Sequence, residues 1–198
     1  MKTNVAILIS GTGTNMVELI KGMKEDHPGK PCVVVSSNPE AAGITKAANL
    51  DIKTYIVNKN NFGSDKRAFE EKLNEILFRH EAEVICLAGF MHILSDDFVS
   101  LWNKNLLNIH PSLLPKFKGL NTHKRAIEAG EKETGCTVHL VTPNLDDGPI
   151  LGQTRVPILC DDTTETLRKR VLDNEIILYT NVLREFLIER IKMLPLNN

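Results

Sequence analysis

The segment Leu106 to Gly119 joins an apolar stretch to residue types that can do chemistry. Asn108 and His110 are two residues apart, so on an extended backbone both side chains project from the same face. Pro111 disfavours helical geometry at His110, which predicts that a strand ends at this pair. An amide and an imidazole on one face can donate hydrogen bonds to a developing oxyanion. The alternative is a pair of hydrogen-bonded structural side chains.

A carboxylate that could support this pair lies in the tight turn L-D-D-G-P, where Asp146 precedes Asp147, Gly148 and Pro149. A carboxylate close to an imidazole raises the pKa of the histidine, so Asp146 would keep His110 protonated if the two segments meet. Such a trio predicts acyl transfer. The alternative for Asp146 is an ordinary turn-forming aspartate. Spacing along the chain leaves open whether the two side chains meet.

The sequence Gly11-Thr12-Gly13-Thr14-Asn15 follows the first apolar run and precedes a stretch with helical spacing. Free backbone N–H groups and the positive end of a helix dipole favour an anion such as phosphate at this position. The segment lacks the Lys-Ser/Thr of a Walker loop and the third glycine of a dinucleotide fingerprint. A phosphomonoester therefore fits better than NAD, and a purely structural tight turn is the alternative.

A second ligand segment is predicted at Ala88 to Leu94, which follows another apolar run. A loop at the carboxyl edge of a sheet can bind a flat heterocycle through main-chain groups. An apolar loop packed on the core is the alternative. Other polar residues are assigned no function: we expect His27, His80, His92 and His123 to be solvated, His139 to be a satisfied strand residue, and Arg168 to Arg170 to be a solvated helix face.

These segments need a scaffold, and the hydrophobic pattern predicts one of the α/β class. Strands are expected at 4–10, 32–36, 54–57, 84–88, 106–109, 137–141 and 153–158, with helices after residue 15, at about 40–49, at 65–80 and from an N-cap at Asp162. Continuous apolar strands indicate a mostly parallel sheet with helices on both faces. The short connection between the last two strands indicates an antiparallel C-terminal pair, so the sheet should be mixed.

Length and composition limit the classes of function. A chain of 198 residues favours a single domain spanning 1–198. The 24 basic and 25 acidic residues nearly cancel, which argues against nucleic-acid or membrane partners. The four cysteines show neither metal-ligand spacing nor a disulfide framework, so we expect reduced thiols that serve as small hydrophobic residues. The first strand begins close to Met1 without an apolar leader, which favours a cytoplasmic protein.

Four motifs together resemble the phosphoribosylglycinamide formyltransferases, a family of folate-dependent formyltransferases: I-S-G-T-G-T-N, A-G-F-M-H-I-L, L-L-N-I-H-P-S-L-L-P and L-D-D-G-P-I. The resemblance runs from about residue 4 to about residue 185. It implies a Rossmann-like fold and transfer of a formyl group from 10-formyltetrahydrofolate to glycinamide ribonucleotide in purine biosynthesis, by a monomer or homodimer without a metal. The third motif is shared with formyltetrahydrofolate hydrolases and methionyl-tRNA formyltransferases, whereas the first motif and the compact length favour the purine enzyme. Formyltetrahydrofolate hydrolysis, transfer to methionyl-tRNA and a non-catalytic nucleotide-binding module remain as alternatives.

The resemblance also implies roles for individual residues. The catalytic trio corresponds to Asn108, His110 and Asp146, and the ribonucleotide site to Gly13, Thr14, Asn15 and Glu175. The folate site corresponds to Lys66, Met91, His92, Ile93, Leu94 and Asn108. Three positions depart from the family pattern. His92 replaces an expected Arg or Lys, Lys66 matches a folate-proximal Arg for which Arg67 or Asp65 are alternatives, and Asp147 replaces a glycine of some relatives.

Overall fold

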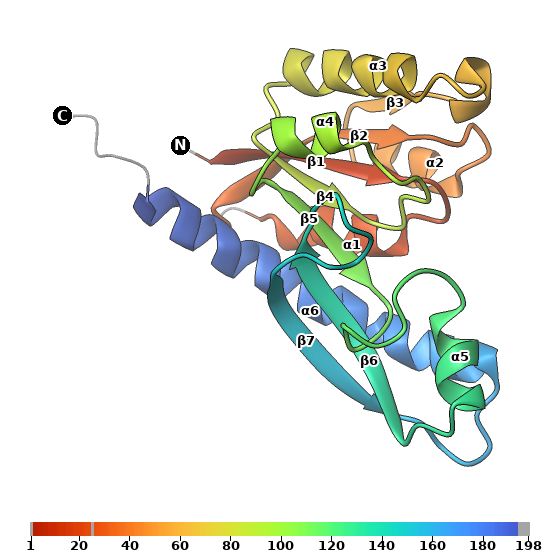
Figure 1. Cartoon of the computed structure of the whole chain (residues 1–198). Helices are drawn as coiled ribbons and strands as arrows, with labels where there is room; N and C mark the ends of the chain where they lie inside the picture. Colours follow the sequence, from red (N-terminus) through yellow and green to blue (C-terminus); the bar gives the residue numbers. More distant parts are fainter. Residues whose placement is uncertain (1, 25, 194–198) are drawn as a thin grey trace.

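A computed structural model describes residues 2–24 and 26–193 (Figure 1). Its sheet has seven strands: β1 Thr3–Ile9, β2 Gly29–Ser36, β3 Thr54–Ile56, β4 Val84–Leu87, β5 Leu106–His110, β6 Glu133–Leu140 and β7 Ile150–Pro157. Their spatial order is β3-β2-β1-β4-β5-β6-β7. The first five strands of this order pair in parallel, whereas β5–β6 and β6–β7 pair antiparallel. The predicted mixed α/β sheet is confirmed.

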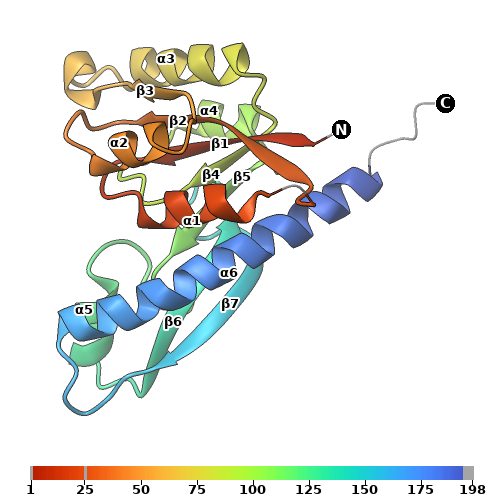
Figure 2. The same ribbon diagram turned by 180° about the vertical axis from the view of Figure 1, so that it is seen from behind.

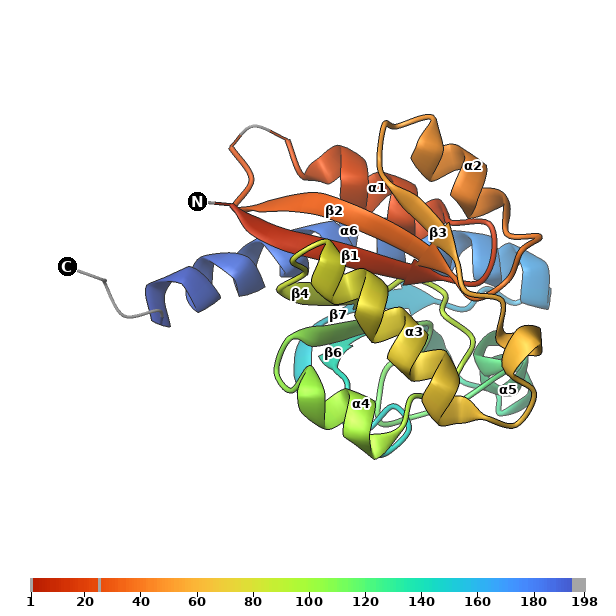
Figure 3. The ribbon, with the colours of Figure 1, turned by 90° about the horizontal axis from the view of Figure 1, so that it is seen from above.

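Helices cover both faces of the sheet, as the continuous apolar strands predicted. They are α1 Thr14–Gly22, α2 Ala42–Ala48, the 3-10 helix η1 Lys59–Phe62, α3 Lys66–Arg79, α4 Asp96–Leu101, α5 Thr122–Glu128 and α6 Thr164–Met193. Figure 2 shows α1, α2 and α6 on one face, and Figure 3 shows α3 and α4 on the other. Successive residues of β2 separate the two cores, because Val34 packs with α1 and α6 while Val33 and Val35 pack with α3.

The predicted boundaries differ from the observed ones mainly in the last two strands. β6 begins at Glu133 and β7 at Ile150, each several residues before the apolar segments that predicted them. The added residues of β6 are polar or small, so hydrophobic periodicity does not mark them as strand. The added residues of β7 include Ile150 and Leu151, which directly follow the turn-rich segment that ends at Pro149. The two strands pair from Glu133 with Pro157 to His139 with Ile150, so backbone pairing extends both strands beyond the predicted segments.

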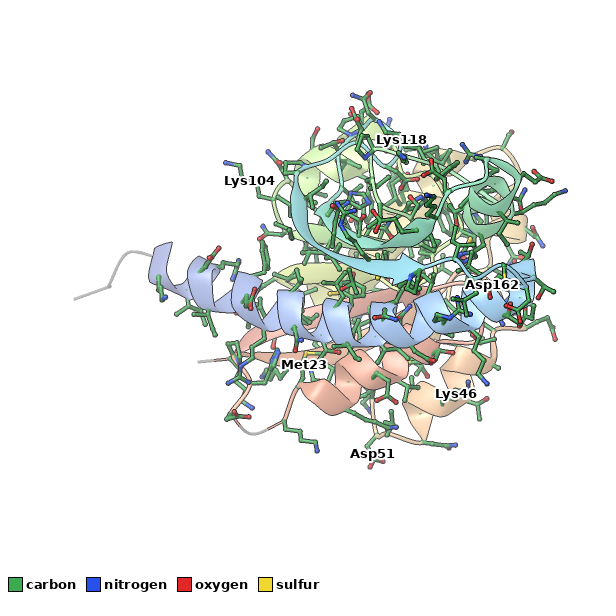
Figure 4. All side chains as sticks on the ribbon, turned by 90° about the horizontal axis from the view of Figure 1, so that it is seen from below. Met23, Lys46, Asp51, Lys104, Lys118 and Asp162 are labelled. Atoms are coloured by element: carbon green, nitrogen blue, oxygen red, sulfur yellow. The ribbon has the colours of Figure 1, made fainter. Side chains whose placement is uncertain are left out.

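The start of α6 corrects a second prediction. The helix begins at Thr164, and the hydroxyl of Thr163 accepts a hydrogen bond from the backbone N–H of Thr166, so Thr163 is the N-cap in place of Asp162. Asp162, at the start of α6 in Figure 4, instead forms an ion pair with Arg170 at 2.7 Å. Arg170 lies nearly two turns into the helix, and its guanidinium meets the carboxylate that precedes the cap.

The described residues form one sheet with its two helical layers, and no helix among them is long and apolar enough to cross a membrane. A single domain over 1–198 stays a prediction, and residues 1, 25 and 194–198 of that range lie outside the described residues. The sheet order reverses direction at β1 and β4, because the chain runs outward from β1 to β2 and β3 before it returns to β4. In open α/β sheets such a switch point leaves a crevice at the carboxyl ends of the strands.

Candidate active site

A cavity of about 690 Å³ lies at the carboxyl ends of the central strands. The segments that follow β4, β5 and β6 contribute most of its lining, and α6 contributes Thr164 and Arg168. Asn108, His110 and Asp146 all line it. Its volume is within the range of pockets that bind small organic ligands.

The last residues of β5 hold the amide and the imidazole at the cavity wall. Asn108 pairs in register with Leu87 of β4 and His139 of β6, and His110 pairs with Thr137. Strands on both sides therefore fix the backbone on which the two side chains stand. Asn108 is half-buried, and His110 is buried. The prediction that a strand ends at this pair is confirmed.

Asp146 meets His110 although 36 positions separate them in the sequence: its Oδ2 atom lies 3.3 Å from Nδ1 of His110. The turn that carries Asp146 closes tightly over β6. A Cβ atom on Gly148 would stand 1.7 Å from the carbonyl oxygen of Leu140, so only glycine fits there. Asp146 itself has a φ of 47°. This turn therefore aims the carboxylate back at the end of β5.

The loop after β5 supplies the remaining partners of this pair. The Phe117 carbonyl oxygen lies 3.0 Å from Nε2 of His110, and the backbone N–H of Gly119 donates to Oδ2 of Asp146 at 2.9 Å. Lys118 forms an ion pair with Asp147, which ties the loop to the turn. Each ring nitrogen of His110 thus faces a hydrogen-bond acceptor. The Phe117 carbonyl is always an acceptor, and the Asp146 carboxylate is one when it is ionised.

The electrostatics correct one expectation. Burial lowers the pKa of His110 below its usual value, and this effect outweighs the Phe117 carbonyl and the Asp146 carboxylate, which both raise it. The expected net increase is therefore wrong, because the site withdraws the ring from water. Burial alone would raise the pKa of Asp146, yet the Gly119 N–H, which donates to Oδ2, and the nearby His110 hold it below its usual range.

His139 belongs to the same cluster, which the sequence analysis missed. Its Nε2 atom lies 3.2 Å from Nδ2 of Asn108 and 3.7 Å from Oδ1 of Asp146. Its side chain is 3% exposed, and it lines the cavity. The sequence predicted an antiparallel pair only for the last two strands, and it assigned no antiparallel partner to the strand that carries Asn108. The register that sets His139 opposite Asn108 would have identified it.

The predicted heterocycle segment forms another wall of the cavity. Met91, His92, Ile93 and Leu94 all line it. The backbone N–H of Met91 donates to the hydroxyl of Ser10, which connects this segment to the end of β1. The His92 ring packs beside both Phe69 and Phe90, with centroid separations of 5.6 and 5.3 Å, and burial lowers its pKa.

The segment Gly11 to Asn15, called the Gly13 loop below, connects β1 to α1 at the same edge of the sheet. Gly13 has a φ of 70°, and a Cβ atom there would stand 2.8 Å from Cα of Gly43, so the glycine permits both the turn and close contact with α2. No side chain of the described residues caps α1, which leaves its first N–H groups for a ligand. The Lys46 ammonium on α2, labelled in Figure 4, donates to the Thr12 carbonyl oxygen at 2.9 Å.

Asn15 and Glu175 meet beside this loop. Nδ2 of Asn15 donates to Oε2 of Glu175 at 2.8 Å, and Oδ1 of Asn15 is buried without a hydrogen-bond partner among the described residues. Burial raises the pKa of Glu175 despite the Asn15 hydrogen bond, which lowers it. The described residues that line the 690 Å³ cavity do not include Gly13, Thr14, Asn15 or Glu175, so the two predicted ligand regions are neighbouring sites.

Lys66, which was predicted to contact the folate, is not among the described residues that line the cavity. It is the first residue of α3, and the described lining includes neither Lys66 nor its alternatives. Asp65 caps the helix by accepting from the N–H of Ala68, and Arg67 pairs with Glu71. The described cations that line the cavity are Lys124 and Arg168.

The surroundings of two other histidines also differ from expectation. His27 is buried rather than solvated, and it packs against Gly29, whose N–H donates to its Nδ1 atom. His123 is partly buried and lines the cavity. Burial lowers the pKa of both. Within residues 2–24 and 26–193, no group of three or more His, Cys, Asp or Glu side chains is arranged to hold a metal ion.

Comparison with known proteins gives a consistent result. Residues 3–183 match the model of the family described as formyl transferase. The chain is 39% identical over 191 residues to the phosphoribosylglycinamide formyltransferase of Escherichia coli strain K12, covering 96% of this chain and 90% of that protein. It is 46% identical over 175 residues to the trifunctional purine biosynthetic protein adenosine-3 of Gallus gallus, covering 88% of this chain but only 17% of that protein.

A solved structure extends the likeness to three dimensions. The phosphoribosylglycinamide formyltransferase of Brucella melitensis superposes with a TM-score of 0.89 at 45% identity, covering 94% of this chain and 96% of that chain. The family match over residues 3–183 includes every described residue that lines the cavity. Together with the structural likeness, this match shows that this chain belongs to the formyl transferase family.

Proposed function

We propose that this protein transfers the formyl group of 10-formyltetrahydrofolate to the amine of N1-(5-phospho-D-ribosyl)glycinamide, giving formylglycinamide ribonucleotide and tetrahydrofolate in de novo purine biosynthesis. The observation that carries the proposal is the meeting of Asn108, His110 and Asp146 on the wall of one cavity. The names and coverage of the relatives support the substrates. The protein is proposed to act in the cytoplasm, as a monomer or homodimer, on small molecules and without a metal, nucleic acid or membrane partner.

The folate is assigned to the cavity segment that contains Met91, His92, Ile93 and Leu94. Met91 and Ile93 are exposed apolar side chains, which suit the flat pterin and its aryl group. Lys66 is assigned to the glutamate tail. The tail is the anionic part of the folate, so it can extend from the cavity toward the start of α3.

The ribonucleotide phosphate is assigned to Gly13, Thr14 and Asn15. The uncapped start of α1 supports this role, because its N–H groups and helix dipole favour an anion. Glu175 is assigned to the glycinamide or ribose part of the same substrate. Its hydrogen bond to Asn15 places it next to the loop, and a buried acceptor suits a donor on the ligand.

In the proposed reaction the glycinamide amine attacks the formyl carbon, and the Asn108 amide donates to the oxyanion that develops. The lowered pKa of His110 supports a neutral imidazole at the start. The amine loses a proton through water to His110, whose imidazolium is then held between the Phe117 carbonyl and Asp146 and stabilises the oxyanion. When the bond from the formyl carbon to the folate nitrogen breaks, this proton passes to that nitrogen. No covalent intermediate on the protein is required.

One assay separates this function from its rivals. The protein is mixed with 10-formyltetrahydrofolate, with and without glycinamide ribonucleotide, and release of tetrahydrofolate is followed. Release only with the ribonucleotide supports the proposal. Release without it indicates a hydrolase, and no release in either mixture indicates a non-catalytic binding module. A His80→Ala variant serves as a control for His110→Ala, because His80 contacts Tyr55 outside the cavity.

A further inference from the structure

His139 stands directly opposite the amide that is proposed to bind the oxyanion. Asn108 of β5 and His139 of β6 are register partners in an antiparallel pair, so their side chains lie on the same face of the sheet. Nδ2 of Asn108 is 3.2 Å from Nε2 of His139. Both residues line the cavity, where Asn108 is half-buried and His139 is buried.

The other ring nitrogen determines which tautomer His139 adopts. Nδ1 of His139 lies 2.9 Å from the carbonyl oxygen of Leu140, and a carbonyl oxygen only accepts hydrogen bonds. Nδ1 therefore carries a hydrogen. In the neutral ring Nε2 then has a free lone pair, which accepts a hydrogen from Nδ2 of Asn108. The Asp146 Oδ1 atom is 3.7 Å from Nε2, which is too far for a hydrogen bond.

We propose that His139 is a positioning residue that sets which end of the Asn108 amide faces the formyl group. The oxygen and nitrogen of an asparagine amide are nearly equal in size, so a hydrogen-bond partner must select between the two orientations. Nε2 of His139 accepts one Asn108 hydrogen and leaves the second for the oxyanion. In the reversed orientation Asn108 would present its carbonyl oxygen to that negative charge. This inference rests on the proposed formyl transfer and adds a residue to it.

Two substitutions separate the two hydrogen bonds of His139. In His139→Asn the new amide nitrogen can replace Nδ1 as donor to Leu140, but the shorter side chain has no atom at the place of Nε2. In His139→Gln the longer side chain can bring its oxygen to that place and accept from Asn108. We expect kcat of His139→Asn to fall by about 10-fold to 10²-fold, which is at most the lower end of the usual cost of losing one oxyanion donor, because Asn108 itself remains. The KM values should stay within about twofold, because ground-state binding is retained.

For His139→Gln, in contrast, we expect a kcat within about threefold of wild type. His80→Asn and His80→Gln are controls, since Nε2 of His80 also makes one side-chain contact, to the Tyr55 hydroxyl at 3.0 Å, but outside the cavity. Thermal unfolding of each variant establishes that it is folded. The inference is overturned if folded His139→Asn has wild-type kcat, if folded His139→Gln loses as much as His139→Asn, or if only KM changes.

A measurement without substrates tests the hydrogen bond itself. Two-bond ¹H–¹⁵N correlation spectra of ligand-free protein report which nitrogen of His139 is protonated. We expect the neutral tautomer with hydrogen on Nδ1 at mildly alkaline pH, and assignment of the hydrogen to Nε2 would overturn the inference. If the wild-type protein transfers no formyl group, the proposed function fails, whereas this spectrum still decides whether Nε2 of His139 is free to accept from Asn108.

Discussion

Nδ1 of His110 lies 3.3 Å from Oδ2 of Asp146, and the two side chains are only 7% and 8% exposed. We expect Asp146→Asn to lower kcat by about 10²-fold or more, because the imidazolium formed during transfer loses its counter-charge. The measurement is steady-state formyl transfer at saturating substrates. Asp147→Asn is the matched control, since that carboxylate pairs with Lys118 at the surface and such pairs contribute about 0–1 kcal/mol. Equal losses in the two variants would contradict the role of Asp146.

The pH dependence of kcat/KM should show that neutral His110 is the reactive form. Burial lowers the pKa of His110 below about 6.5, so its imidazole is neutral at neutral pH. We therefore expect kcat/KM to decline as the pH falls below about 6.5. Asp146→Asn should move this decline to lower pH, because Asp146 raises the pKa of His110. A kcat/KM that instead falls as the pH rises through this region would mean that imidazolium is needed at the start.

Replacement of the oxyanion donor should affect chemistry more than folding. We expect Asn108→Ala to lower kcat by about 10²- to 10³-fold, the usual cost of removing such a donor. Asn103→Ala is a control, because Asn103 is exposed and lies outside the cavity lining. Thermal unfolding should show that both variants fold. Wild-type turnover by folded Asn108→Ala would refute the assignment.

The Gly13 loop can be tested by its steric requirement. Gly13→Ala would place a Cβ atom 2.7 Å from Cε of Met16 and 2.8 Å from Cα of Gly43, in addition to the strain at a φ of 70°. We expect a KM for the ribonucleotide raised by about 10-fold or more and little change in the KM for folate. Gly130→Ala is the matched control, since Gly130 has a φ of 67° with nothing within 4 Å of its added Cβ. A rise confined to the folate KM would argue against a phosphate site.

Acid should destabilise the folded protein through its buried histidines. Burial lowers the pKa values of His27, His92, His110 and His123, so below about 6.5 the unfolded chain binds more protons than the folded one. Stability therefore rises with pH across this range and is lost as the pH falls from about 7 through the folded pKa values. Urea unfolding at a series of pH values measures this slope. His27→Gln should reduce the slope, and a slope unchanged by it would exclude His27 as a contributor.

The local sequence is sufficient to predict the positions of most strands and the end of β5. Apolar runs and Pro111 act on neighbouring residues, so the strand that carries Asn108 and His110 can be recognised from its own segment. The Gly13 turn was predictable for the same reason, because a glycine directly before residues with helical spacing indicates a tight turn at the start of a helix. The first residues of β6 and of β7 were missed, since these extensions depend on backbone pairing with each other.

The sequence by itself determined the α/β class, the chemistry of the candidate residues and, through four motifs, the family that they resemble. Only the tertiary structure decided that Asp146 reaches His110, that His139 stands beside Asn108, and that Lys66 is outside the cavity lining of the described residues. It also decided the direction of the His110 pKa, because burial is a property of packing and outweighs the nearby carboxylate. Contacts between residues distant in sequence depend on strand register and turn geometry, which local composition does not encode.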